Sequence, residues 1–145
     1  MSSPTATATR ARIAVGGVAV RPIGALLAIS VAIIHVVDQG GIPGSKDPAY
    51  IGYLYWILEI AAVICAVLLL IPALSGAGWV LALGVAAGPI IAYVLSRSTG
   101  LPNYTDDKGN WGETIGVISL IVEGLLLVFA IGTLAAGRTR SRVTT

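Results

Sequence analysis

Two glutamates stand inside long apolar stretches of the sequence, where ionisable residues are rare. Glu59 lies in the stretch 51–71 and Glu123 in the stretch 114–136. If both stretches are helices entered from the same side, a rise of about 1.5 Å per residue places the two carboxyls about 12 and about 14 Å deep. A charge near the bilayer centre costs at least about 2.5–3.5 kcal/mol. Both side chains should therefore face the interior of the protein.

The chemistry of such a pair is proton or cation binding. Two carboxyls that lie close together in a low-dielectric environment do not both ionise easily, so they would share a proton or hold a cation. The alternative is a pair of neutral glutamates that hydrogen-bond across helices. Glu59 and Glu123 are therefore candidate ligand- or proton-binding residues.

A second polar group is expected at the end of the bundle where these two stretches begin. His35 and Asp38 are three residues apart, so on a helix they share one face. Arg97 follows the apolar stretch 79–95, and Glu113 precedes the last stretch. Together these four residues would form an outward-facing site in which His35 moves protons. The alternative gives His35 a structural role, with Arg97 reaching the interface and Asp38 capping a helix or balancing the arginine.

The sequence offers little to a metal or an organic cofactor. It contains one histidine and one cysteine, too few for a zinc or copper site built on these ligands. The segment DDKGNWGE at 106–113 lacks the D-x-[DN]-x-[DN]-G spacing of a calcium loop. Motifs of serine hydrolases, nucleotide-binding loops, zinc proteases and dinucleotide-binding folds are absent. We predict no metal and no cofactor, and the question of an enzyme stays open, with the balance against one.

The elements that position these residues follow from composition. Of the 145 residues, 56% are hydrophobic and only 11% are charged, against about 25% charged in soluble domains. A backbone surrounded by lipid must be helical, because each N–H and C=O needs an internal partner. We predict an all-α membrane protein, a bundle of four transmembrane helices in the domain 22–136. The expected spans are 22–37, 51–71, 79–95 and 114–136. A tail with a short interfacial lead-in, 1–21, precedes the domain, and a basic tail, 137–145, follows it.

Small residues are expected where these helices touch. Gly84-x-x-x-Gly88 in the third stretch and Gly116 in the fourth would let helix backbones approach closely. The small faces, together with the polar residues on them, should converge in a tight bundle.

Positive charges predict the orientation. Arginines flank the first and last spans, whereas the two longer loops are rich in acidic residues, so the positive-inside rule places both termini in the cytoplasm. The flanking arginines are Arg10, Arg12, Arg21, Arg138, Arg140 and Arg142. They are better explained by topology and anionic lipid than by nucleic acid, which we exclude as a partner. The expected location is the cell membrane, as a multi-pass protein of the bacterial plasma membrane.

Three functional hypotheses remain open from the sequence. The first is binding or transport of a proton, cation or small molecule at an intramembrane carboxylate site reached from outside. The second is an accessory subunit that uses its glycine and alanine faces to dock on a larger membrane complex. The same faces could instead join copies of the chain into a homo-oligomer. The third is a membrane enzyme that uses glutamate, aspartate or histidine as acid and base on a lipophilic substrate. Beyond the lipid bilayer, the sequence names no partner.

Overall fold

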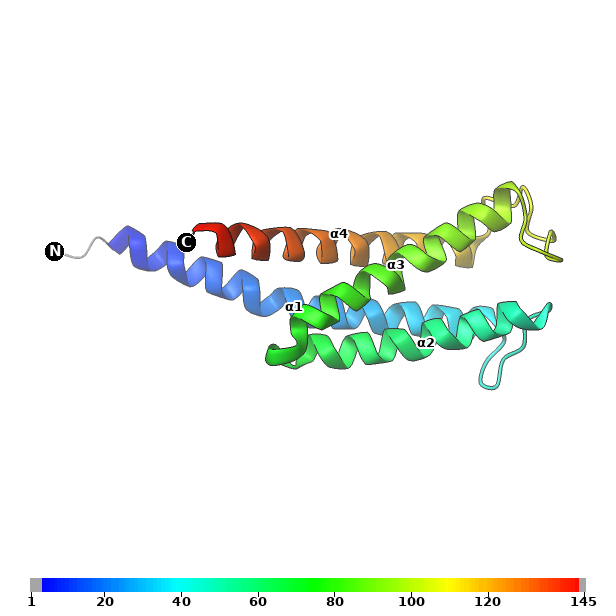
Figure 1. The fold of residues 1–145 in the computed structure, drawn as a ribbon, viewed down its shortest axis with the longest axis horizontal. Helices are drawn as coiled ribbons and strands as arrows, with labels where there is room; N and C mark the ends of the chain where they lie inside the picture. The colour runs from blue at the N-terminus through cyan, green and yellow to red at the C-terminus, as the bar shows by residue number, and fades with distance from the viewer. Residues whose placement is uncertain (1–3, 144–145) are drawn as a thin grey trace.

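The protein is a bundle of four long helices. The computed structural model describes the backbone of residues 4–143 and the side chains of residues 19–137. The elements are α1 (Pro4–Asp38), α2 (Ala49–Leu70), the short 3-10 helix η1 (Pro72–Leu74), α3 (Ser75–Ser98) and α4 (Thr114–Val143), with no β-strand among the described residues (Figure 1). The predicted all-α class and the four-helix bundle are confirmed.

Each helix contains a segment long and apolar enough to cross a membrane. These segments are Ala19–Asp38, Ala49–Leu70, Pro72–Ser98 and Thr114–Gly137. They agree with the predicted spans within three residues at all but one boundary, the start of the third, which begins at Pro72 because η1 and α3 run on from one another. Four such helices indicate a membrane-embedded protein.

The first helix begins earlier than predicted. We expected the first span to begin at residue 22, after a tail with a short interfacial lead-in, but α1 begins at Pro4 and contains Pro22 in its interior. That expectation was wrong because the apolar residues 13–20 continue the helix, and a proline is tolerated inside a helix when neighbouring groups compensate for the lost hydrogen bond. At the other end of the chain, α4 continues to Val143 into the predicted basic tail.

Both long connections lie at one end of the bundle. The loops 39–48 and 99–113 both lie there, and the two ends of the chain lie toward the opposite end (Figure 1). We call the first the loop end and the second the terminus end. The antiparallel order of the helices produces this arrangement, because two of the three connections are long and the third is only η1.

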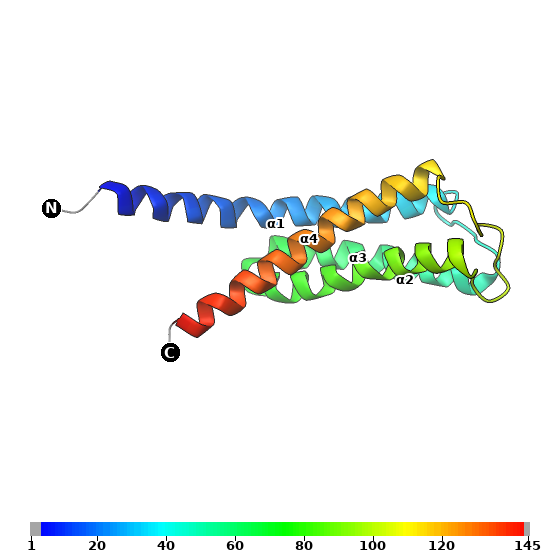
Figure 2. The ribbon, with the colours of Figure 1, turned by 90° about the horizontal axis from the view of Figure 1, so that it is seen from above.

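The helices form a ring in chain order. α1 packs against α2 and α4, and α3 packs against the same two helices, whereas α2 and α4 lie across the diagonal without close backbone contact among the described residues. α3 runs obliquely, close to α2 at the terminus end and close to α4 at the loop end (Figures 1 and 2). The terminus half is therefore closed between α2 and α3, and the loop half is closed between α3 and α4.

Small side chains close the terminus half. A Cβ added to Gly78 would lie 2.9 Å from the backbone nitrogen of Leu69, and one added to Gly24 would lie 2.5 Å from the Trp79 ring. More than half of the residues in the buried hydrophobic core are alanines, and small residues of this kind let helices approach closely. The alanines are Ala25, Ala28, Ala32, Ala62, Ala66, Ala82, Ala86 and Ala130. The buried polar side chains lie on the loop side of this core; they are His35, Gln39, Ser96, Arg97, Ser119 and Glu123.

Candidate functional site

A cavity of about 430 Å³ occupies the loop half of the bundle. All four helices contribute to its wall, and the loop 99–113 forms its roof with Leu101, Tyr104, Asp107 and Glu113. The volume is within the range of about 300–1,000 Å³ that is typical of small-molecule sites. Most of the wall is apolar, and the polar side chains form three groups at increasing depth.

The deepest group joins α1 to α4. His35 and Glu123 are 8% and 1% exposed, and the distance from His35 Nε2 to Glu123 Oε1 is 3.7 Å. His35 Nδ1 donates to the Val31 carbonyl at 2.9 Å, which leaves Nε2 directed toward the carboxyl. The Ser119 hydroxyl donates to Glu123 Oε1 at 2.5 Å. One proton between imidazole and carboxyl is the arrangement that leaves this buried pair without net charge.

The second group surrounds Asp38 at the end of α1. The Tyr55 hydroxyl donates to the Asp38 carboxylate, and Lys46 Nζ lies 3.2 Å from Asp38 Oδ2. The Tyr55 ring meets the His35 ring edge-on, with centroids 5.2 Å apart. Tyr55 therefore connects the buried histidine to the aspartate and lysine at the loop end.

The third group ties the roof to α3. Arg97 pairs with Glu113 and, at 3.1 Å, with Asp107. Its guanidinium carbon lies 4.1 Å from the centroid of the Tyr93 ring, a cation–π arrangement. Arg97 is 8% exposed, so two carboxylates balance one buried cation.

The tyrosines complete the attachment of the loop 99–113. The Tyr104 hydroxyl donates to Asp107 at 2.8 Å, and the Tyr93 hydroxyl donates to the Trp111 carbonyl at 2.6 Å. Burial, and then the hydrogen bond to the Asp107 carboxylate, raise the pKa of Tyr104 above its ordinary value, so its phenol stays a donor at neutral pH. The Tyr50 hydroxyl donates to the Pro102 carbonyl at 2.7 Å.

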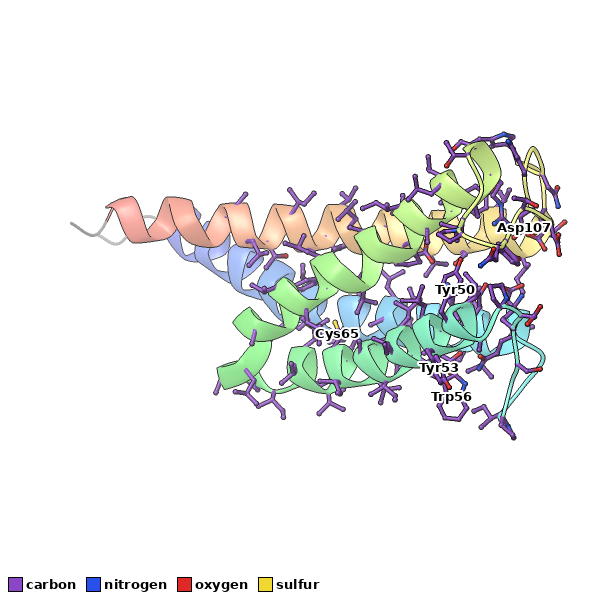
Figure 3. All side chains as sticks on the ribbon, turned by 45° about the vertical axis from the view of Figure 1, so that its right-hand side comes forward. Tyr50, Tyr53, Trp56, Cys65 and Asp107 are labelled. Carbon is purple, nitrogen blue, oxygen red and sulfur yellow. The ribbon has the colours of Figure 1, made fainter. Side chains whose placement is uncertain are left out.

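Figure 3 shows Tyr50 on the side of α2 that faces this loop and Asp107 within it, whereas Tyr53 and Trp56 point away from the bundle. Tyr53 and Trp56 are 69% and 42% exposed, positions suited to an interfacial aromatic belt. The aromatic residues of α2 thus divide between the roof of the cavity and the outer surface.

The exposed residues of the cavity wall all lie on one side of the bundle. Of all the lining residues, only four are exposed, and they lie on α2 and α3: Leu54, Ile57, Gly84 and Gly88. Each belongs to a segment long and apolar enough to span a membrane. The lining residues of the roof are half-buried. The opening therefore lies along the groove between α2 and α3.

The predicted glutamate pair is not brought together. Glu123 lies in the cavity beside His35, but Glu59 is not among the lining residues, and their helices lie across the diagonal of the ring. Glu59 is half-buried next to Gln39. Its buried Oε1 has no hydrogen-bond partner in the described part of the chain, and neither has the Gln39 amide.

The second predicted group is brought to one cavity. His35, Asp38, Arg97 and Glu113 all line it. Asp38 does not balance Arg97, however, because Asp38 pairs with Lys46 and Arg97 with Asp107 and Glu113.

Sequence reasoning missed Tyr55, Tyr93, Tyr104 and Asp107 as members of the site. The available signal was the gathering of tyrosines and acids toward one end of the predicted spans.

The three glycines that we expected to pack behave differently. A Cβ added to Gly116 would lie 2.7 Å from Tyr93 Cε2, so Gly116 does pack where α3 meets α4. A Cβ added to Gly84 or Gly88 would meet nothing within 4 Å. In the described structure, these two glycines leave space in the cavity wall.

Among the described side chains, those of residues 19–137, no group of three or more histidine, cysteine or acidic residues is arranged to hold a metal ion. A comparison of the chain with protein-family models, with curated proteins and with solved structures finds no match.

Proposed function

We propose that the protein binds a lipophilic small molecule, which enters the cavity from the bilayer between α2 and α3 and is held by the His35–Glu123 pair. The observation that carries this proposal is the location of the opening: all four exposed lining residues belong to the apolar segments of α2 and α3. An opening flanked by Leu54 and Ile57 favours an apolar molecule dissolved in the bilayer over one dissolved in water.

The polar contents of the cavity support a ligand with a polar group. A site for a purely apolar ligand would not require a buried acid. Glu123 is only 1% exposed, and an ionisable side chain inside a membrane costs free energy. Ser119 and His35 orient this carboxyl toward the cavity. A ligand with an apolar body and one polar end fits both parts of the wall.

The roof supports entry from the bilayer and not from water. Five side-chain interactions tie the loop 99–113 to α2 and α3 or close the loop on itself. This differs from our expectation of a site reached from outside. The positive-inside rule favours an orientation in the bacterial plasma membrane that places the roof on the outer side and both termini in the cytoplasm.

Filling the cavity wall tests the proposal. Gly84→Leu places a side chain where a Cβ meets nothing, so the fold should tolerate it while the cavity loses volume. Gly132→Leu is the matched control, because Gly132 on α4 also has open space at its Cβ and does not line the cavity. Native mass spectrometry of the protein purified in mild detergent should show a small bound molecule in the wild type and in Gly132→Leu, and none in Gly84→Leu.

Equal occupancy in all three proteins would overturn the proposal, as would a wild type without any bound small molecule. A second protein chain that is bound to the wild type and lost in Gly84→Leu would also overturn it. That result would make the groove between α2 and α3 a docking surface for another subunit.

A further inference from the structure

The acids of the cavity differ in what balances them. Asp38 pairs with Lys46, and Asp107 and Glu113 pair with Arg97. Glu123 is the exception among the acids that line the cavity: its neighbours are the Ser119 hydroxyl and the His35 imidazole. No lysine or arginine of the described side chains balances it.

The His35–Glu123 pair has room for one positive charge. His35 Nδ1 is occupied by the Val31 carbonyl, so the pair presents Nε2 and the carboxylate toward each other. A buried carboxylate needs a compensating charge or a proton. In the empty cavity that charge is one proton, held on the imidazole or on the carboxyl.

We infer that the ligand is a lipophilic amine, bound as an ammonium ion at Glu123 in place of that proton. This inference rests on the proposed function. The ammonium N–H groups donate to the Glu123 carboxylate and to the free Nε2 of His35, and the apolar body lies along α2 and α3. One ammonium ion enters and one proton leaves to bulk water, so the charge of the cavity does not change.

The rest of the cavity agrees with a cationic ligand. Outside the His35–Glu123 pair, the carboxylates Asp38, Asp107 and Glu113 are paired with only two cations, Lys46 and Arg97, which leaves one negative charge in excess. Tyrosine rings add negative π-faces to the wall. The ionisable and charged groups around the pair come from every element packed against it. They are Asp38 of α1, Lys46 of the loop 39–48, Tyr55 of α2, Tyr93 and Arg97 of α3, Tyr104, Asp107 and Glu113 of the loop 99–113.

A matched pair of fluorescent probes tests the charge of the ligand. Pyrenylbutylamine is cationic at neutral pH, and pyrenylbutanol is a neutral molecule of nearly the same shape. Binding is measured by fluorescence anisotropy with the protein in lipid nanodiscs, and empty nanodiscs correct for partition into lipid. The wild type should bind the amine at least about tenfold more tightly than the alcohol, because a hydrogen bond to a charged partner is worth more than one to a neutral partner.

Two substitutions distinguish binding at the cavity from partition of the probes into the membrane. Glu123→Gln should weaken amine binding by about tenfold or more, and it should weaken alcohol binding less, because the glutamine amide can still form a neutral hydrogen bond with a hydroxyl. Glu59→Gln is the matched control, since Glu59 lies at a comparable place in another span but outside the cavity. It should change neither probe. His35→Gln provides a second variant if Glu123→Gln does not fold, and it should also weaken the amine.

The pH dependence is a second readout. Because the amine displaces a proton, its affinity for the wild type should rise as the pH rises, and its affinity for Glu123→Gln should not. Equal saturable binding of both probes, unchanged in Glu123→Gln, would overturn the inference that the ligand is an amine. The cavity would then remain a site for lipophilic molecules without a preference for charge. The absence of saturable binding by either probe would overturn the proposed function as well.

Discussion

At the scale of single residues, partner identity decides what each charged side chain can do. Arg97 has two carboxylates and a tyrosine ring around it, so it serves to hold the roof. Glu123 has a hydroxyl and an imidazole, so it remains free to bind a ligand. Residue type alone does not distinguish these roles, since both side chains are ionisable and buried.

Replacing Arg97 with methionine should destabilise the protein. The substitution keeps the apolar stem over Tyr93 but leaves Asp107 and Glu113 without their cation. Their side chains are 24% and 34% exposed, so we expect a loss of about 2 kcal/mol, below the about 3–5 kcal/mol of a fully buried pair. Thermal unfolding in detergent, followed by tryptophan fluorescence, measures the effect.

Glu113→Gln is the control for this prediction, because Asp107 still balances the arginine. It should lose less stability than Arg97→Met. An Arg97→Met protein as stable as the wild type would show that the ion pairs do not hold the roof.

The sequence predicts which residues of the site are unusual, but not which of them meet. His35, Asp38, Arg97, Glu113 and Glu123 were all recognisable as ionisable residues in or beside apolar stretches. Whether Glu123 meets Glu59 or His35 depends on which helices are neighbours in the ring. No spacing along one helix contains that information.

At the scale of helices, the surroundings of each glycine show whether it lies at a helix–helix contact or at the wall of the cavity. Gly116 lies under the Tyr93 ring. Two interactions hold this ring in place: the hydrogen bond from the Tyr93 hydroxyl to the Trp111 carbonyl and the contact with the Arg97 guanidinium. Gly84 faces open space. The two glycines look alike in the sequence, since each lies in an apolar stretch with a small residue four positions away.

Gly116→Ala and Gly84→Ala should therefore differ in stability. The added methyl of Gly116→Ala would lie 2.7 Å from the tyrosine ring, and overpacking of this kind costs about 1–3 kcal/mol. Gly84→Ala should cost nothing measurable. The same thermal unfolding experiment compares them, and an equal loss in both variants would contradict the packing described for α3 and α4.

The extents of the membrane-spanning segments were largely predictable, because the hydropathy and length of an apolar stretch determine whether it can cross a bilayer. The start of α1 was not, because Pro22 is equally compatible with a helix start and with a tolerated interior position. The oblique path of α3 was not predictable either. It results from close packing of Gly78 against Leu69 at one end and of Gly116 against Tyr93 at the other.

At the scale of the whole molecule, the two ends of the bundle have different tasks. Alanine and glycine contacts close the terminus end, and the roofed cavity occupies the loop end. The closely packed terminus half would support the loop half, where we propose that a ligand binds.

The orientation of the molecule is testable with one introduced cysteine. Asp106 is exposed in the loop 99–113, and the native Cys65 is buried. In intact cells, Asp106→Cys should react with a maleimide that cannot cross membranes. Reaction only after the cells are broken would place the roof and both termini on the opposite sides from those that we propose.

The most direct test of the central claim uses a photoreactive amine. A long-chain amine carrying an alkyl diazirine forms, on irradiation, a species that carboxyl groups trap, and peptide mapping by mass spectrometry identifies the labelled residue. Glu59 serves as a control within the same chain, because it is an intramembrane glutamate outside the cavity. We predict that Glu123 is labelled well above Glu59 and that excess unlabelled amine suppresses the label on Glu123 alone. Equal labelling of the two glutamates, without competition, would contradict a ligand site at Glu123.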